Sequence, residues 1–360
     1  MFGTTRYIAW AMQFYGKVPY DLASSGTPLV TWAELGLPTP DIDDPRAYQA
    51  LKDACARYND VSPAEVTPAF GTTQAFFLAY AATLSPGDEV LVEHPGYEPL
   101  TRAAEGLGAT VRTFERRAEE GFRVLPERVA AAIGPRTRAI VVTSLHNPTG
   151  VRVADETIRE LAAIAEARGA YVIVNEVYAG FDDLPEDGVF RRSARKLDKN
   201  VIAVASLTKC YGLGMYRLGW LLGPEEIALR ADAAAVATLG HMPLAHASYG
   251  AALFGEIGRL AKRAKVLLAG KREIASRWAT SLPNAHWSAP ESGLFGLVTL
   301  PGRGELLPRI EAHARETGVL VGAGTFFGAP ESFRLAWATC DAARFEEGLR
   351  LLEPLVSRRA

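Results

Sequence analysis

Residues 138–178, RAIVVTSLHNPTGVRVADETIRELAAIAEARGAYVIVNEVY, decide the fold. They contain two short, nearly continuous apolar runs, over 138–150 and 170–178, and each run predicts a strand that is covered on both faces. Between them, 154–168 repeats apolar residues with the period of a helix. Asp155 stands near the start of this helix, where the helix dipole favours a negative charge. The stretch therefore predicts a strand–helix–strand unit with parallel strands.

The same alternation extends outward from this unit, over about residues 45–240. The other predicted helices are 46–58 and 73–83, and the other predicted strands are 88–94, 108–115 and 200–207. This alternation predicts a mostly parallel sheet with helices on both faces, and ligands bind such sheets beyond the carboxyl ends of the strands. Polar residues that end the last three strands are therefore expected on one functional edge: His146, Asn147, Asn175, Ser206 and Lys209.

The pattern changes after about residue 240. A long helical stretch rich in Ala and Lys/Arg, 244–278, precedes short predicted strands and a closing helix, at 294–300, 318–324, 332–338 and 342–356. These elements predict a smaller α+β domain. We expect residues 1–40 to form an N-terminal arm that packs with this small domain, residues 41–242 to form a large domain, and residues 243–360 to form the small domain.

Composition limits the class of protein and its partners. The chain has 360 residues, which suits two domains, and 48% of them are hydrophobic and 22% charged, as in globular proteins. Because 39 basic residues balance 41 acidic ones, neither nucleic acid nor a membrane is expected as a partner. Three scattered cysteines predict no disulfide framework, and no apolar segment is long enough for a bilayer span or a signal peptide. A cytoplasmic protein is expected.

The segment SLTKCYGLGMYRLGW, residues 206–220, carries the strongest chemical signal. Taken alone, Lys209 just past a buried strand would be an ordinary loop cation that reaches solvent. However, Ser206 precedes it by three residues and Arg217 follows eight residues later, with glycines between them. A lysine that forms an imine needs a desolvated, partly neutral amine. A nearby dianionic phosphate needs a guanidinium and a hydroxyl, which Arg217 and Ser206 are suited to supply.

This segment resembles the cofactor-lysine motif of the class I/II aminotransferases, which are fold-type-I enzymes that use pyridoxal 5′-phosphate (PLP). The resemblance extends, in order, through most of the chain. It implies an α/β fold with a large, mostly parallel-sheet α/β/α domain and a smaller α+β domain, assembled as a homodimer. It also implies an aminotransferase that moves an amino group between an L-amino acid and a 2-oxo acid through a Lys209 imine.

The resemblance assigns a phosphate site to PAFGTTQAF, residues 68–76. This segment is a glycine turn that opens a helix, and a plain N-cap is the alternative interpretation. Backbone amides at a helix N-terminus also bind anions. Because the family holds the PLP phosphate here, Thr72 and Thr73 take that role, together with Ser206 and Arg217.

Three contacts with the PLP ring are implied in the same way. The motifs EHPGYEPL, SLHNPTG and IVNEVYAGF begin at residues 93, 144 and 173. They place Tyr97 on the face of the ring, and Asn147 and Tyr178 at its phenolic oxygen. On local evidence, Tyr97 and Tyr178 could equally be structural aromatics, and Asn-Pro-Thr-Gly could be only a turn. The ordered spacing of the motifs favours the cofactor interpretation.

Asn175 is a departure from the family pattern. The family has Asp-Glu-x-Tyr at this point, and the Asp carboxylate keeps the pyridine nitrogen protonated, which makes the ring an electron sink. A neutral amide can form a hydrogen bond to that nitrogen but cannot stabilise its positive charge. Glu176 does not replace the carboxylate, because successive strand residues face opposite sides. A weaker electron sink is expected.

Arg334, in ESFRLAWA at residues 331–338, lies inside an apolar strand pattern, where an unpaired charge is costly to bury. A surface salt bridge is one interpretation. The resemblance implies instead that Arg334 binds the substrate α-carboxylate, and that Ser25 and Gly26 belong to a loop over the substrate. Ile42 stands where many relatives have a Tyr that reaches the partner subunit's phosphate. No histidine or cysteine spacing predicts a metal site.

Two other functions remain open at the level of sequence. The first is a PLP-dependent lyase, cyclase, racemase or oxidase of a biosynthetic pathway, which Asn175 suggests. The second is a PLP-binding protein without catalysis. The retained lysine and phosphate residues argue against this second alternative.

Overall fold

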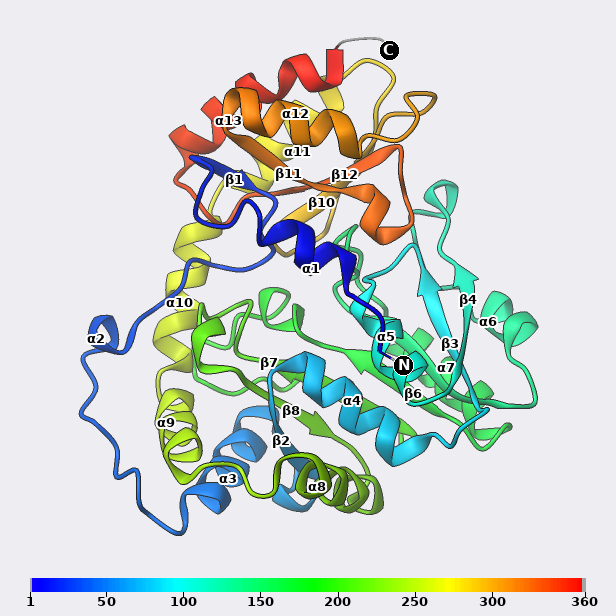
Figure 1. Cartoon of the computed structure of the whole chain (residues 1–360), viewed down its shortest axis with the longest axis vertical. Coiled ribbons are helices and arrows are strands. Elements are labelled where there is room, and N and C mark those ends of the chain that lie inside the picture. The colour runs from blue at the N-terminus through cyan, green and yellow to red at the C-terminus, as the bar shows by residue number, and fades with distance from the viewer. Residues whose placement is uncertain (1, 358–360) are drawn as a thin grey trace.

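The structure is a computed structural model that describes residues 2–357 and contains two sheets, one above the other in Figure 1. The larger sheet has the strand order β2-β8-β7-β6-β5-β3-β4. Its strands are β2 (Val66–Phe70), β3 (Glu89–His94), β4 (Thr110–Glu115), β5 (Thr137–Thr143), β6 (Tyr171–Asn175), β7 (Val201–Ser206) and β8 (Leu218–Leu222). All neighbours are parallel except β8, which runs antiparallel to both β2 and β7. The mostly parallel sheet expected from the sequence is confirmed.

Helices cover both faces of the larger sheet, which is why its central strands are apolar throughout. Ile173 on β6 packs in one buried cluster with residues of α4 (Thr72–Thr83), α5 (Pro99–Gly106) and α8 (Glu225–Leu239). Val172 and Val174, which face the other way, pack with residues of α6 (Pro126–Ala132) and α7 (Asp155–Glu166). Burial on both sides removes a large apolar area from water, the dominant favourable term in folding.

The smaller sheet has the order β1-β11-β12-β10-β9. Its strands are β1 (Tyr20–Leu22), β9 (His286–Ser288), β10 (Phe295–Thr299), β11 (Val319–Ala323) and β12 (Ser332–Ala336). β1 pairs with β11 in parallel, so the N-terminal part of the chain joins this sheet, while the remaining pairs are antiparallel. Helices α11 (Lys271–Ser281), α12 (Leu307–Thr317) and α13 (Ala342–Ser357) lie around it (Figure 1).

The helical stretch expected over 244–278 is divided into three helices, α9 (Leu244–Phe254), α10 (Ile257–Leu268) and α11. Gly255 follows the first, and Gly270, with φ +73°, precedes the third. α9 packs on α3 (Ala47–Asn59) of the larger part, and a Cβ at Gly250 would lie 2.8 Å from Leu218. The domain boundary placed before residue 243 stays a prediction.

Two further short helices, α1 (Arg6–Ala11) and α2 (Trp32–Leu35), lie in the N-terminal 40 residues. Figure 1 shows α1 between the two sheets. Among residues 2–357, no helix combines the length and the apolar character that crossing a membrane requires.

A buried ion pair ties the ends of three strands of the larger sheet together. Arg116, just after β4, donates from Nη1 to Oε2 of Glu93 on β3 at 2.6 Å, and neither side chain is exposed. The other carboxylate oxygen of Glu93 accepts a hydrogen bond from the backbone amide of Thr143 on β5.

Replacing Arg116 by Met should lower the free energy of unfolding by about 3 to 5 kcal/mol, because the Glu93 carboxylate would be left buried without its cation. Denaturant unfolding measures this loss. Arg136→Met is the matched control, since the Arg136 side chain is 65% exposed and its pair with Glu89 should contribute about 1 kcal/mol or less. Equal losses for the two variants would contradict this role of the buried pair.

Candidate active site

A cavity of about 250 Å³ opens at the carboxyl ends of β6 and β7, facing the smaller sheet. Eight residues predicted from the sequence line it: Thr72, Thr73, Tyr97, Asn175, Tyr178, Ser206, Lys209 and Arg217. The other four predicted residues, Ser25, Gly26, Asn147 and Arg334, do not line the cavity but contact residues at its edge or each other. The structure thus brings all the predicted residues into one region.

Lys209 follows β7, and its Nζ donates to the hydroxyl of Ser25 at 3.3 Å. Burial lowers the pKa of Lys209 to about 8, and the positive charges of Arg334 and Arg217 act in the same direction, while the Tyr7 phenol opposes them. Gly26 lies against the same side chain, because a Cβ at Gly26 would be only 3.4 Å from Lys209 Cδ. Near neutral pH a substantial fraction of this amine is therefore available as a nucleophile.

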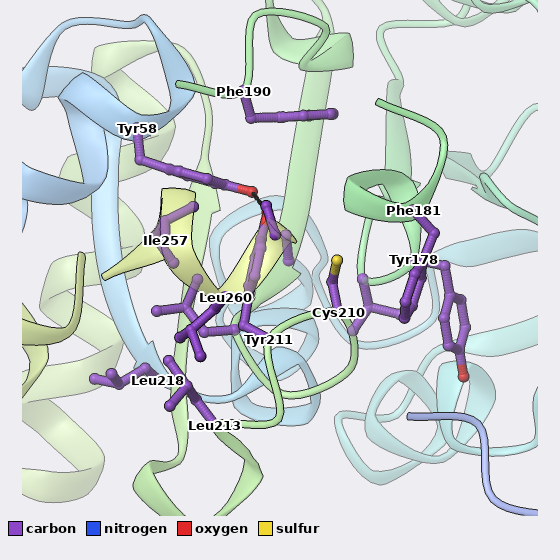
Figure 2. Packing of buried hydrophobic residues seen from close by; sticks show 14 of the residues in the cluster. Tyr58, Tyr178, Phe181, Phe190, Cys210, Tyr211, Leu213, Leu218, Ile257 and Leu260 are labelled. Carbon is purple, nitrogen blue, oxygen red and sulfur yellow. Dashed lines mark hydrogen bonds between the residues drawn. The ribbon is translucent and has the colours of Figure 1, made fainter. Parts of the chain in front are cut away.

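The residues next to Lys209 in the chain belong to the core rather than to the cavity. Figure 2 shows Cys210 and Tyr211 among buried apolar side chains, with the hydroxyl of Tyr211 hydrogen-bonded to that of Tyr58 at 2.7 Å. Burial raises the pKa of the Cys210 thiol, so this cysteine is a packing residue and not a nucleophile. This packing fixes the backbone from which Lys209 projects.

One end of the cavity is suited to an anion. α4 begins at Thr72, with no acidic residue in its first turn, and the Thr72 hydroxyl is buried without a hydrogen-bond partner among residues 2–357. Gly71 precedes it with φ +80°, and a Cβ there would lie 2.6 Å from Nη2 of Arg217. A free helix N-terminus, an unpaired hydroxyl and a guanidinium together match a phosphate group.

Asn175 ends β6 and faces the cavity with its amide. Its Oδ1 accepts a hydrogen bond from the backbone amide of Val177 at 3.2 Å. Among the described residues, the Asn175 Nδ2 has no acceptor. The side chain therefore presents a neutral donor to whatever the cavity holds.

Two aromatic residues border the same space. The Tyr178 hydroxyl donates to the Ser25 hydroxyl at 2.9 Å, and burial raises the pKa of Tyr178. Burial also raises the pKa of Tyr97 well above its usual value, so both phenols stay neutral. Tyr97 lines the cavity and meets the ring of Tyr7 edge-on, at 5.8 Å between centroids.

Arg334 on β12 is fully buried, and no carboxylate lies within salt-bridge distance of it among residues 2–357. Its Nη1 donates to Oδ1 of Asn147 at 2.6 Å, and its Nη2 donates to the Tyr7 hydroxyl and to the Ala23 carbonyl. Among the described residues, its Nε has no hydrogen-bond partner. A buried cation paired only with neutral acceptors has a strong electrostatic preference for an anionic ligand.

The sequence motifs missed the contribution of α1. Tyr7, Ile8 and Ala11 of α1, and Tyr15 shortly after it, line the cavity. The only signal available was the spacing of Tyr7, Trp10, Ala11 and Phe14, which is that of one helix face and is also typical of simple core packing. Ile42, by contrast, does not line the cavity and is 45% exposed.

The fold and the site combine a mostly parallel sheet with a lysine and an anion-binding helix N-terminus in one cavity at its carboxyl edge. The chain belongs to the aminotransferase class I and II family, whose model matches residues 41–352. Enzymes of this family use PLP. The unpaired Thr72 hydroxyl and the close approach of Arg217 to Gly71 fit the phosphate of that cofactor.

Relatives and solved structures agree with this family. The aspartate/prephenate aminotransferase of Thermus thermophilus is 31% identical over 321 residues, which cover 86% of this chain and 80% of that protein. The capreomycidine synthase of Streptomyces vinaceus is 26% identical over 366 residues, covering 94% and 90%. A double mutant of the T. thermophilus aspartate aminotransferase has a TM-score of 0.78 at 26% identity, covering 99% of this chain and 100% of that one. The PLP-dependent cyclase OrfR has a TM-score of 0.81 at 25% identity, covering 99% and 98%.

The lowered pKa of Lys209 predicts how PLP capture depends on pH. In cofactor-free protein, the rate of PLP capture should rise about tenfold per pH unit below pH 8 and level off above it, because only the neutral amine attacks an aldehyde. The growth of the visible absorbance of bound PLP measures this rate. A rate that continues to rise up to pH 10, as expected for an ordinary lysine, would contradict a buried amine.

Proposed function

We propose that this enzyme moves an amino group between an L-amino acid and a 2-oxo acid, and that Lys209 is the residue that binds PLP covalently. The observation that carries this proposal is the position of the half-buried Lys209 side chain. It lies in the same cavity as the anion-binding end at Thr72 and Arg217. Class I and II family membership supports the same chemistry.

Each residue of the site has a defined task in this proposal. PLP, when bound, supplies an aldehyde that captures amines and a ring that accepts electrons from the substrate α-carbon. Thr72, Thr73, Ser206 and Arg217 hold the phosphate. With PLP bound, Tyr97 would cover one face of the ring, Asn147 and Tyr178 would donate hydrogen bonds to its phenolic oxygen, and Asn175 would donate to its nitrogen.

The remaining residues act on the substrate. Arg334 binds the α-carboxylate, and Ser25 and Gly26 form part of the wall beside Lys209. Burial lowers the pKa of Lys209, so that its neutral Nζ could accept the proton that leaves the substrate α-carbon.

We also propose a homodimer with the predicted arm, large and small domains, 1–40, 41–242 and 243–360. Large apolar side chains on α8, on α9 and beside Arg217 are at least one-third exposed: Val236, Leu239, Leu244 and Met215. Such a grouping favours an interface between copies. Cys55, Cys210 and Cys340 are free thiols, which supports a reducing, cytoplasmic location.

Product analysis tests the proposed reaction. The PLP-loaded protein is incubated with a panel of L-amino acids, with and without a 2-oxo acid. Amine consumption that needs the 2-oxo acid and forms its amino acid is the expected result, and Lys209→Ala should abolish it. Release of ammonia or peroxide without a 2-oxo acid would contradict transamination.

A second candidate function is a lyase, cyclase, racemase or oxidase reaction on the same cofactor. Asn175 favours it. A ring whose nitrogen is paired with a neutral amide stabilises a carbanion at the substrate α-carbon less than a ring whose nitrogen is paired with a carboxylate. The similarity to a capreomycidine synthase and to a PLP-dependent cyclase supports it further.

Asn175→Asp separates the two candidates. If the site performs transamination, the added carboxylate should raise turnover with a 2-oxo acid by about tenfold, since an adjacent opposite charge shifts a pKa by about one to three units. Initial rates with saturating amino acid measure this change. Asn200→Asp is the control. Asn200 lies just before β7, at the amino ends of the parallel strands, and this change should leave the turnover unchanged. Unchanged or lower turnover of Asn175→Asp would mean that the site is built around the neutral amide.

A further inference from the structure

Helix α1 is attached to both parts of the molecule. The backbone amide of Tyr7 donates to Oε2 of Glu98, at the start of α5 on the larger sheet, at 3.1 Å. The indole nitrogen of Trp10 donates to Oε1 of Glu311, on α12 beside the smaller sheet, also at 3.1 Å. These two bonds hold α1 between the two sheets, in the position that Figure 1 shows, and Tyr7, Ile8 and Ala11 of this helix line the cavity.

The ring of Tyr7 is fixed as firmly as its backbone. It is 7% exposed and meets the rings of Tyr97, Phe326 and Phe327 at centroid distances of 5.5 to 5.8 Å. Contacts with three aromatic rings fix the orientation of the Tyr7 ring. In this orientation its hydroxyl is hydrogen-bonded to Arg334.

The Tyr7 hydroxyl can still donate one hydrogen bond. Its oxygen accepts from Nη2 of Arg334 at 2.8 Å, and an arginine cannot accept a bond in return. Among residues 2–357, no acceptor lies within hydrogen-bond distance for the phenolic hydrogen. Because Tyr7 also lines the cavity, this hydrogen is available to a ligand there.

Arg334 alone offers fewer free donors than a guanidinium normally has. Nη2 uses both of its N–H groups, one for the Tyr7 hydroxyl and one for the Ala23 carbonyl. Nη1 uses one of its two for Asn147, so that one Nη1 N–H and the Nε N–H remain without a partner among residues 2–357. The usual two-donor fork for a carboxylate is thus partly occupied by the protein itself.

We propose that Tyr7 is a second carboxylate-binding residue, whose hydroxyl is oriented by Arg334 and donates a hydrogen bond to the α-carboxylate of the substrate. The proposal rests on the function proposed above and adds a recognition group to that site. Polarisation of the phenol by the guanidinium strengthens it as a donor. The site then recognises a carboxylate through the Arg334–Tyr7 pair rather than through arginine alone.

Two small aminooxy compounds test this role without knowledge of the natural substrate. Aminooxyacetate and methoxyamine carry the same reactive group, but only aminooxyacetate has a carboxylate. Both react with protein-bound PLP and abolish its visible absorbance, so stopped-flow spectroscopy gives a second-order rate constant for each. The ratio of the two constants reports recognition of the carboxylate and does not depend on turnover.

Tyr7→Phe keeps the aromatic contacts and removes only the hydroxyl. We expect the rate constant for aminooxyacetate to fall about tenfold, as for the loss of a hydrogen bond to a charged group, while the constant for methoxyamine changes less than twofold. Tyr171→Phe removes a phenol hydroxyl that donates to Glu226 at the opposite edge of the sheet, and both constants should be unchanged.

Equal losses for both compounds would overturn the proposal, since they would indicate general damage to the site. An unchanged ratio in Tyr7→Phe would overturn it as well. The same measurements on the unsubstituted protein distinguish these outcomes from a failure of the proposed function. If it showed no visible band after PLP loading, or did not react with methoxyamine, the assignment of Lys209 would fail first and the role of Tyr7 with it.

Discussion

The parallel register of β5, β6 and β7 is the constraint on which the rest of the site depends. Thr143 pairs with Asn175, and Asn175 pairs with Val204, so the three strands end within a few residues of one another at the same edge. Helices bury both faces of these strands. The polar residues that follow the strands therefore lie together at the carboxyl edge of the sheet. Asn175 and Lys209 therefore line one cavity, although 34 positions of sequence separate them.

Arg334 joins this edge to the smaller sheet. It comes from β12, yet its guanidinium contacts Asn147 from the larger part and Tyr7 from α1, and it lies over the ring of Phe295 at 5.1 Å. A buried cation with neutral partners is costly unless an anion completes it. The same charge lowers the pKa of Lys209, although burial contributes more. If Arg334 binds the substrate carboxylate as proposed, that binding offsets a charge that lowers the pKa of Lys209.

Much of this arrangement could be predicted from the sequence, and the limits have physical causes. Asn175, Ser206 and Lys209 follow apolar runs directly, so local patterning places them at strand ends. Arg334 and Asn147 are 187 residues apart, and only the resemblance to the family related both to one site. Tyr7 could not be predicted, because its helix has six residues and no motif and its partners come entirely from distant segments. Strand β8 was not predicted, because its first residues belong to the segment that was interpreted as the glycine-rich cofactor motif. The stretch 244–278 read as continuous because helical periodicity persists across the breaks at Gly255 and Gly270.

The central claim is that the buried amine of Lys209 is the one that binds PLP. Borohydride reduction of the PLP-loaded protein, followed by proteolysis and mass spectrometry of the labelled peptide, tests it most directly. The structure contains a natural alternative in Lys271, which is 3% exposed and whose pKa is also lowered by burial, but which donates to the Cys340 carbonyl. The label is expected on Lys209 alone. A label on Lys271 or on any other lysine, with Lys209 unmodified, would contradict it.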